Sequence, residues 1–141
     1  MEKVLLEDGK SYLELIAGEY NGKKGPASTF SPLSLFNARL SKGGVAYFNF
    51  ERSQNTGIIV IEGDIKINGS KSVHENYFIY FNHDGDNIAI EAINDSIILV
   101  LSGESLNEQV ISHGPFVMNT EAEIKMAYED YYNGKYGYLE D

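Results

Sequence analysis

Short apolar runs alternate with polar residues over most of the chain. The runs that predict β-strands lie at residues 12–16, 34–40, 45–50, 58–61, 65–67, 77–81, 88–92 and 97–101. Within residues 65–67 and 88–90 the apolar side chains stand at alternate positions, so that they share one face of a strand. Short strands spaced by about 8–12 residues are typical of a β-sandwich or a β-barrel, and not of alternating strands and helices.

The residues between these runs favour tight turns. Asn68-Gly69 and Asp84-Gly85, for example, combine a glycine, which tolerates positive φ, with a side chain that hydrogen-bonds to nearby backbone. Such pairs end a strand and reverse the chain. The sequence has no internal repeat, low-complexity tract or linker. We therefore expect a single domain over residues 1–141.

The pattern changes once, close to the C-terminus. Thr120 is a favourable N-cap residue, and Glu123 follows it at the spacing of a capping box. Asn133 and Gly134 then supply a signal for the end of a helix. Together these signals predict one helix at about residues 120–133, after a β-rich domain at about residues 7–113.

One face of this helix is predicted to be apolar. Its residues recur at helical spacing and are Ile124, Ala127, Tyr128 and Tyr131. Since an apolar stripe must be covered, we expect it to pack against the barrel. Two interpretations of the C-terminal tyrosines stay open: an exposed docking face, or half-exposed aromatic side chains around this packing contact.

Composition narrows the classes of partner. The chain has 21 acidic residues and 11 Lys or Arg residues, which gives a formal net charge of −10. An acidic surface repels phosphate, so nucleic acid and anionic membranes are not expected as partners. The absence of cysteine excludes disulfides, thiol nucleophiles and Cys-based zinc sites. The N-terminus lacks a signal-peptide pattern and no apolar run approaches the ~20 residues that span a bilayer, so we expect a cytoplasmic protein.

The C-terminal part of the chain carries an extended motif. It reads Gly114-Pro115-Phe116-Val117-Met118-Asn119-Thr120, preceded by Leu101-Ser102-Gly103-Glu104 and Leu106-Asn107-Glu108 and followed by Glu129-Asp130-Tyr131 and Gly134-Lys135-Tyr136-Gly137. These segments resemble the C-terminal signature of the pirin family. Ser105 and Gln109 stand where the family usually has proline, and Tyr136 stands where it has phenylalanine. Upstream segments extend the resemblance to residues 7–137.

The resemblance implies a fold, and it covers only the C-terminal one of the two cupin halves of pirins. The C-terminal half of pirins is a double-stranded β-helix, a cupin jelly-roll barrel, so the implied fold class is all-β with one C-terminal α-helix. In pirins the N-terminal half binds iron through three histidines and a glutamate. This sequence contains no segment that matches those ligands.

The metal-binding spacing of the first cupin motif can also be laid on this chain, between Gly43 and Gly63. It assigns three ligand positions to Asn49, Glu51 and Thr56, and the second cupin motif, opened at Asn76, assigns the fourth to Asn87. Of these, only Glu51 is a carboxylate or imidazole donor, whereas a divalent transition metal needs about three. The alignment therefore predicts degenerate ligand positions, no metal, no other cofactor and no catalytic residue.

The three histidines do not change this prediction. His74 and His83 flank a predicted strand and are expected in surface turns, and His113 belongs to the pirin-like motif. Asp84-Gly85-Asp86 lacks the ligand spacing of an EF-hand calcium loop and is expected to be a polar turn. Nucleotide-binding and hydrolase motifs are absent as well.

Two functions stay open. The first is a non-catalytic cupin-type module, related to pirin and without its own metal site, that binds a small molecule in the barrel or a partner protein. The alternative is a metal-dependent dioxygenase, implied by the quercetinase-like activity of some pirins. Such an enzyme would act alone or with a partner cupin half.

A homodimer is the expected state of association. In pirins the matching half packs against a second cupin domain, so a surface that the family buries would face water here. A symmetric dimer covers such a surface with one self-complementary patch. The alternatives are a monomer whose surface is polar, and a pair with a separate cupin that resembles the pirin N-terminal half.

Overall fold

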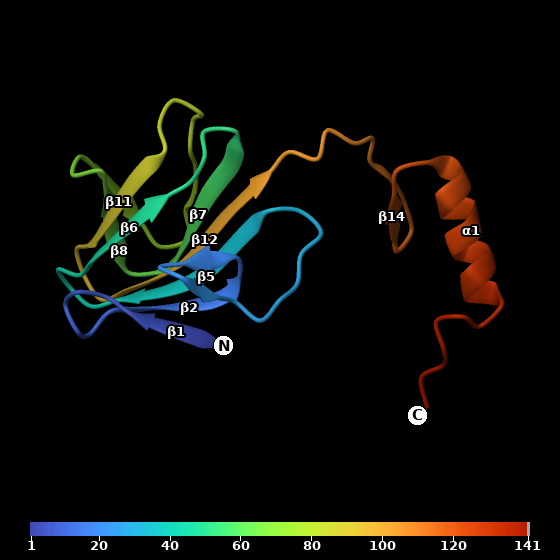
Figure 1. Cartoon of the computed structure of the whole chain (residues 1–141), viewed down its shortest axis with the longest axis horizontal. Coiled ribbons are helices and arrows are strands. Elements are labelled where there is room, and N and C mark those ends of the chain that lie inside the picture. The colour runs from blue at the N-terminus through green and yellow to red at the C-terminus, as the bar shows by residue number, and fades with distance from the viewer. Residues whose placement is uncertain (141) are drawn as a thin grey trace. The chain divides into compact units, whose positions relative to one another are not determined.

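The computed structural model describes residues 1–140, which form two compact units (Figure 1). The first unit, Met1–Ser105, holds both large β-sheets, and the second, from Leu106 onward, holds a β-hairpin and a helix. The sequence predicts one domain with a barrel as far as residue 113. The last strand of the two sheets instead ends at Glu104, because the strands that follow it pair with each other in the second unit.

The larger sheet of the first unit consists of six antiparallel strands. In their order across the sheet they are β1 (Glu2–Leu5), β2 (Tyr12–Ala17), β5 (Leu33–Leu40), β12 (Ser96–Glu104), β7 (Gln54–Glu62) and β10 (Phe78–Tyr80). The central strand β12 pairs with β5 on one side and with β7 on the other. Its alternation is strict: Ile98 and Val100 are fully buried, whereas Ile97, Leu99 and Leu101 on the opposite face are half-buried.

The smaller sheet has four antiparallel strands. In order they are β6 (Val45–Asn49), β11 (Asn87–Ala92), β8 (Asp64–Ile67) and β9 (Lys71–His74), and a separate ribbon pairs β3 (Glu19–Tyr20) with β4 (Lys23–Lys24). The predicted Asn68-Gly69 turn joins β8 to β9. Both residues have positive φ, 49° and 73°, as a type I′ hairpin turn requires at its two central positions. The turn closes with a hydrogen bond from the Ser70 amide to the Ile67 carbonyl oxygen at 3.1 Å.

The two sheets enclose one hydrophobic core. A group of aromatic rings lies within it: Phe48 stacks on Phe50 with ring centroids 6.0 Å apart, and Phe36 stacks on both. Tyr20 meets Phe36 and Phe48 edge-on. The fully buried aliphatic side chains come from alternate strand positions and include Leu13, Leu15, Ile58, Val60, Ile65, Ile90, Ile98 and Val100. The period-two pattern of the sequence therefore builds the core.

The predicted all-β fold class with one C-terminal helix is confirmed for the described residues. The two sheets form a β-sandwich. Within residues 1–140, no ladder joins β10, which ends the larger sheet, to β9, which ends the smaller one. The sandwich is therefore open on this side and does not close into a continuous barrel.

The second unit begins with a short hairpin. β13 (Ile111–His113) pairs with β14 (Phe116–Met118), and α1 follows at Glu121–Tyr132. Thr120 is the N-cap residue, as predicted, since its Oγ1 accepts a hydrogen bond from the Glu123 amide at 3.2 Å. This bond satisfies one of the amide groups that a helix leaves free at its start.

The C-terminal end of α1 also follows the prediction. Gly134 has a φ of 73°, and its amide donates to the carbonyl oxygen of Tyr131 at 3.0 Å. The amide of Lys135 donates to the carbonyl oxygen of Asp130, also at 3.0 Å. These two bonds form a Schellman motif, which ends a helix at a glycine.

The hairpin covers the apolar face of α1. Ile124 and Ala127 are buried, and the ring of Tyr128 meets Phe116 of β14 edge-on at 4.9 Å between centroids. Tyr131 is 60% exposed, so its predicted place in the buried stripe is wrong. The strands of the hairpin have three residues each, and their cover does not extend to this turn of the helix.

The helix α1 has 12 residues. Within residues 1–140, no helix is both long enough and apolar enough to cross a lipid bilayer.

Candidate functional site

The four degenerate cupin positions lie near the ends of β6, β7 and β11. Asn49 is the last residue of β6 and Asn87 is the first of β11, and the strand register pairs them directly. Glu51 is exposed in the loop after β6, and Thr56 is buried in β7. The alignment therefore does select residues from one end of the first unit.

Two of these residues face away from the core, which corrects the alignment. Phe48 and Phe50 are buried, whereas Asn49 between them is exposed. Asn87 is also exposed, and its neighbour Ile88 is buried. A spacing rule fixes the number of residues between ligands, but a shift of one residue moves a side chain to the other face of a strand. Apolar side chains, and not the two asparagines, hold the inward positions.

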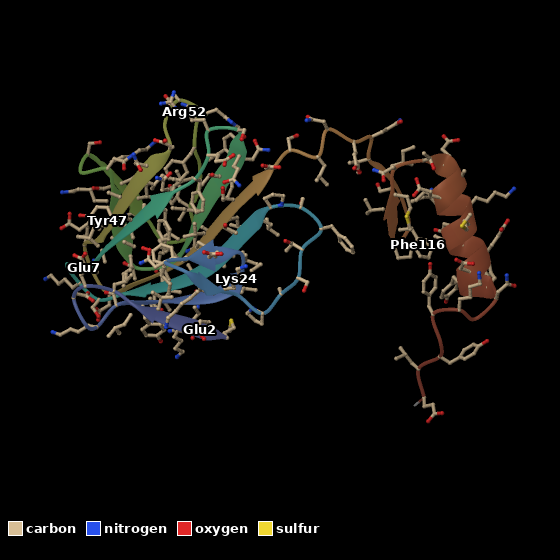
Figure 2. The ribbon with its side chains drawn as sticks, viewed as in Figure 1. Glu2, Glu7, Lys24, Tyr47, Arg52 and Phe116 are labelled. Carbon is tan, nitrogen blue, oxygen red and sulfur yellow. The ribbon has the colours of Figure 1, made fainter. Side chains whose placement is uncertain are left out.

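A pocket of about 320 Å³ opens at this end of the unit, and we name it the mouth pocket. Its lining includes Phe50, Glu51, Arg52, Gln54, Thr56, Ile67, Ile88 and Asn87. Arg52 lies at the tip of the loop that follows β6 (Figure 2). Three of the four predicted positions thus share the mouth pocket, while Asn49 lines a separate pocket of about 360 Å³.

The hydroxyl group of Thr56 is already bonded within the protein. Its Oγ1 lies 2.7 Å from Oγ of Ser102 on β12, and both side chains are buried. The Ser102 hydroxyl donates to Oε1 of Gln54 at 3.3 Å. Buried polar groups are normally satisfied in this way. At the position aligned with a metal-binding glutamate, the chain therefore offers a neutral oxygen that has a partner.

The donors of the mouth pocket do not fit a transition metal. Its carboxylates belong to Glu51, Asp84 and Asp86, and no imidazole lines it. Within residues 1–140, no three His, Cys, Asp or Glu side chains gather closely enough to hold a metal ion. Amide and hydroxyl groups next to Arg52 and Lys71 suit hydrogen bonds to a neutral polar molecule better than coordination of a metal.

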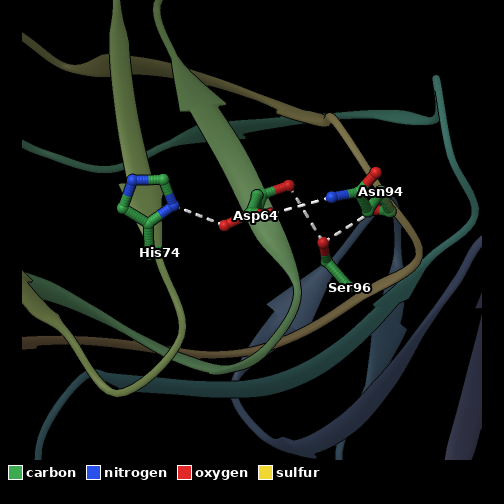
Figure 3. Close-up of polar contacts among 4 residues, drawn as sticks. All are labelled: Asp64, His74, Asn94 and Ser96. Atoms are coloured by element: carbon green, nitrogen blue, oxygen red, sulfur yellow. Dashed lines mark hydrogen bonds and ion pairs between the residues drawn. The ribbon is translucent and has the colours of Figure 1, made fainter.

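A polar cluster that the sequence analysis missed is centred on Asp64 (Figure 3). Its Oδ1 lies 2.5 Å from Nδ1 of His74, and its Oδ2 accepts a hydrogen bond from Nδ2 of Asn94 at 2.7 Å. The Ser96 hydroxyl donates to the Asp64 carbonyl oxygen at 3.1 Å. The hydrogen bond with His74, followed by that from Asn94, lowers the pKa of the Asp64 carboxyl. This carboxylate is therefore charged at neutral pH.

The other two histidines have different surroundings. Nδ1 of His83 lies 2.6 Å from the carbonyl oxygen of Arg52, and Nε2 lies 3.1 Å from Oδ1 of Asn55. The ring of His113, in the second unit, meets Tyr128 edge-on at 5.7 Å between centroids. All three histidine side chains are exposed. His83 lies in a turn, as predicted, whereas His74 is the last residue of β9 and not part of a turn. Only His74 is hydrogen-bonded to a carboxylate among the contacts described above.

An apolar patch covers part of the outer face of the larger sheet. In the register, Leu99 of β12 lies opposite Ile59 of β7, and Leu101 lies opposite Leu35 of β5. The aliphatic side chains on this face are Leu33, Leu35, Ile59, Ile61, Ile97, Leu99 and Leu101, which we name the sheet patch. None of them is fully buried. The unbroken apolar run at 97–101 was the sequence signal for it, since such runs are typical of strands covered on both faces.

The family follows from a comparison with known proteins. Residues 35–137 match the family model of the pirin C-terminal cupin domain. The chain belongs to this family. The resemblance to the pirin C-terminal cupin domain noted in the sequence is thus confirmed. The two sheets of the first unit form a cupin-type β-sandwich.

Relatives of this pirin C-terminal cupin domain are longer proteins. One from Pseudomonas aeruginosa, named "Putative quercetin 2,3-dioxygenase", is 36% identical over 134 residues, which are 95% of this chain and 46% of that protein. Human pirin is 31% identical over 128 residues, which are 88% of this chain and 44% of pirin. The crystal structure of a quercetin 2,3-dioxygenase from Acinetobacter baumannii matches with a TM-score of 0.86 and 35% identity, covering 99% of this chain and 48% of that one. The chain therefore spans about half the length of these relatives.

Proposed function

We propose that this chain is a non-catalytic cupin module, without a metal site of its own, that binds another cupin domain through the sheet patch. The observation that carries the proposal is the patch itself. It places seven aliphatic side chains on the three adjacent strands β5, β12 and β7. A contiguous apolar surface on a water-soluble domain usually marks a contact site.

The partner that we propose is a second copy of the chain. The formal net charge is −10, yet Leu99 and Leu101 at the centre of the patch are flanked in the register by Ile59, Leu35, Gly57 and Asn37. The centre of the patch that would face a second copy is therefore uncharged, and Arg39 and Glu62 flank Ile97 at its edge. β-Sheets pack face to face with their strands aligned or orthogonal, and a two-fold axis buries the same patch on both partners.

The half-length match to pirins supports a cupin as the partner. A separately encoded cupin that resembles the pirin N-terminal half would use the same apolar chemistry. The mass of the purified chain separates the two arrangements, because only self-association doubles it.

Light scattering over a micromolar dilution series at moderate salt tests the proposal. We expect wild type at twice 15.7 kDa, and Leu99→Lys at 15.7 kDa, because an ammonium group is costly to bury in an apolar contact. Tyr47→Lys is the matched control, since Tyr47 is exposed on the other sheet (Figure 2), and it should leave the mass unchanged. A wild-type mass of 15.7 kDa at every dilution, or a dimeric Leu99→Lys variant, contradicts the proposed dimer.

A second candidate, a quercetinase-type dioxygenase, is favoured by the names of two relatives. The donors of this chain do not fit a transition metal, so such an activity would require a metal-bearing partner domain. Oxygen uptake with quercetin and added Fe²⁺ or Ni²⁺ tests this candidate. We expect no uptake above the metal alone. Uptake that is present in wild type and lost in Glu51→Gln would overturn the non-catalytic assignment.

A further inference from the structure

A groove of about 360 Å³ lies on the open side of the sandwich, between β9 of the smaller sheet and β10 of the larger one. Val73 in its lining is buried. Three aromatic side chains that line it stay more than half exposed: Tyr77 at 62%, Phe78 at 59% and Tyr80 at 57%. Aromatic side chains around an apolar hollow offer surfaces against which a flat ring can pack. We name this site the aromatic groove.

One wall of the aromatic groove is fixed in position. The ring of Phe78 lies over Gly57 of the neighbouring strand β7, so closely that a Cβ at this glycine would collide with the ring. Phe78 pairs with Ile59 in the register, and its ring is supported by the sheet on one side. The wall therefore exists before any ligand arrives, which lowers the ordering cost of binding.

The aromatic groove also holds a histidine whose two nitrogens have different roles. Nδ1 of His74 lies 2.5 Å from Oδ1 of Asp64, and Asn94 holds the other carboxylate oxygen (Figure 3). A neutral imidazole in this geometry donates its Nδ1 proton to the carboxylate and keeps Nε2 as an acceptor. The His74 side chain is 70% exposed and lines the groove. Nε2 can therefore accept a hydrogen bond from a ligand.

The chemistry of the lining selects the ligand. The aromatic rings favour a planar ring, Nε2 of a neutral His74 accepts from a hydroxyl or N–H donor, and the ammonium group of Lys71 favours a ligand that carries partial negative charge. A peptide strand is disfavoured, because β10 has only three residues to pair with it. We propose that the aromatic groove binds a planar phenol, whose hydroxyl group donates to Nε2 of His74 and whose ring packs against Tyr77 and Phe78. None of these residues belongs to the sheet patch, although Phe78 pairs in the register with Ile59 of that patch.

Two probes of the same size test the role of the hydroxyl group. 2-Naphthol has the donor, and 2-methoxynaphthalene lacks it. Titration of each into the full chain is followed by the imidazole nitrogen signals of the three histidines. We expect 2-naphthol to shift Nε2 of His74 and to bind roughly three- to tenfold more tightly than 2-methoxynaphthalene, as for one neutral hydrogen bond.

Variants locate the effect. His74→Phe removes the acceptor and should weaken 2-naphthol to the affinity of 2-methoxynaphthalene, and Tyr77→Ala should weaken both probes. His113→Phe, in the second unit, is the matched control and should change neither. Equal affinity of wild type for the two probes, no binding of either, or shifts at His83 in place of His74 would overturn the proposal. The comparison of the two probes on wild type stands even if a variant does not fold.

Discussion

The first unit buries a continuous core between two sheets, whereas the second buries only two apolar side chains among its described residues, Ile124 and Ala127. Phe36, Phe48 and Phe50 form a stack in the first unit. The second unit relies on local hydrogen bonds at both ends of α1 and on a hairpin whose two strands have three residues each. Burial of apolar side chains therefore stabilises the first unit, whereas the second unit depends mainly on the hydrogen bonds of its helix caps and hairpin.

The second unit buries far fewer apolar side chains than the first and leaves several exposed. Segments below about 40 residues rarely bury enough area to fold alone. Its exposed apolar side chains include Leu106, Val110, Val117, Met126 and Leu139. We therefore expect the two units to respond separately to substitution, and the following predictions test that expectation, from the largest effect to the smallest.

Phe48→Ala should produce the largest loss of stability. The ring is 2% exposed and stacks on Phe36 and Phe50, so its removal leaves a cavity that costs ~3–5 kcal/mol of unfolding free energy. Urea denaturation followed by tyrosine fluorescence measures this loss. Tyr47→Ala, one position away on the exposed face, is the control and should cost far less. Equal losses in both variants would mean that the stack is not the centre of the core.

Ile124→Ala should act on the second unit alone. Ile124 is 9% exposed and lies on the covered face of α1, and a buried truncation of this kind costs ~2–4 kcal/mol. Hydrogen exchange should accelerate at the amides of residues 106–140, while those of β12 and β7 keep their protection. Faster exchange throughout the first unit would show that the two units unfold together.

Thr120→Ala removes the N-cap of α1. We expect a loss of about 1 kcal/mol in the local stability of the helix, because the Glu123 amide loses its hydrogen-bond partner. Thr120→Ser keeps the hydroxyl group and is the matched control. The same exchange experiment reports both variants, and identical rates for alanine and serine would contradict the capping role.

The smallest effect concerns pH and the first unit. The pKa of Asp64 lies below its ordinary value because of the hydrogen bonds from His74 and Asn94. A carboxyl whose pKa is lowered by folding stabilises the fold above its unfolded pKa, near 3.8, and loses this contribution as the pH falls through the lower folded value. Urea midpoints should therefore fall less steeply below about pH 4 in Asp64→Asn than in wild type. Asp84→Asn, in the loop after β10, serves as the control and should keep the wild-type slope.

Much of the fold could be predicted from the sequence, because its signals are local. Apolar runs predicted eight of the strands but not β1, β3, β4, β9, β13 and β14. Asn68-Gly69 predicted a hairpin turn, and Thr120 and Gly134 predicted the ends of the helix. The division of the chain into two units could not be predicted in this way. An apolar stripe on a helix predicts that this face is buried, but it does not predict which surface packs against it.

The candidate sites were harder to predict because they depend on strand register and on the face of the strand from which each side chain projects. The cupin spacing selected Asn49 in place of its buried neighbours, since counting residues does not fix the face of a strand. The His74–Asp64 contact joins residues ten positions apart. It follows from the register of β8 with β9, which sets Ile67 opposite Lys71 and Asp64 opposite His74. A two-residue turn at Asn68-Gly69 would instead set Ile67 opposite Ser70, so the turn motif alone does not give this contact.

Elemental analysis of the purified, tag-free chain tests the central claim most directly. Phe48, Phe50 and Ile88 are buried, and Phe50 and Ile88 line the mouth pocket, where a cupin metal centre would need carboxylate and imidazole donors. We therefore expect iron, zinc, manganese and nickel together at far less than one equivalent per chain. Close to one equivalent of any of these metals, retained through dialysis without added metal, would contradict this claim.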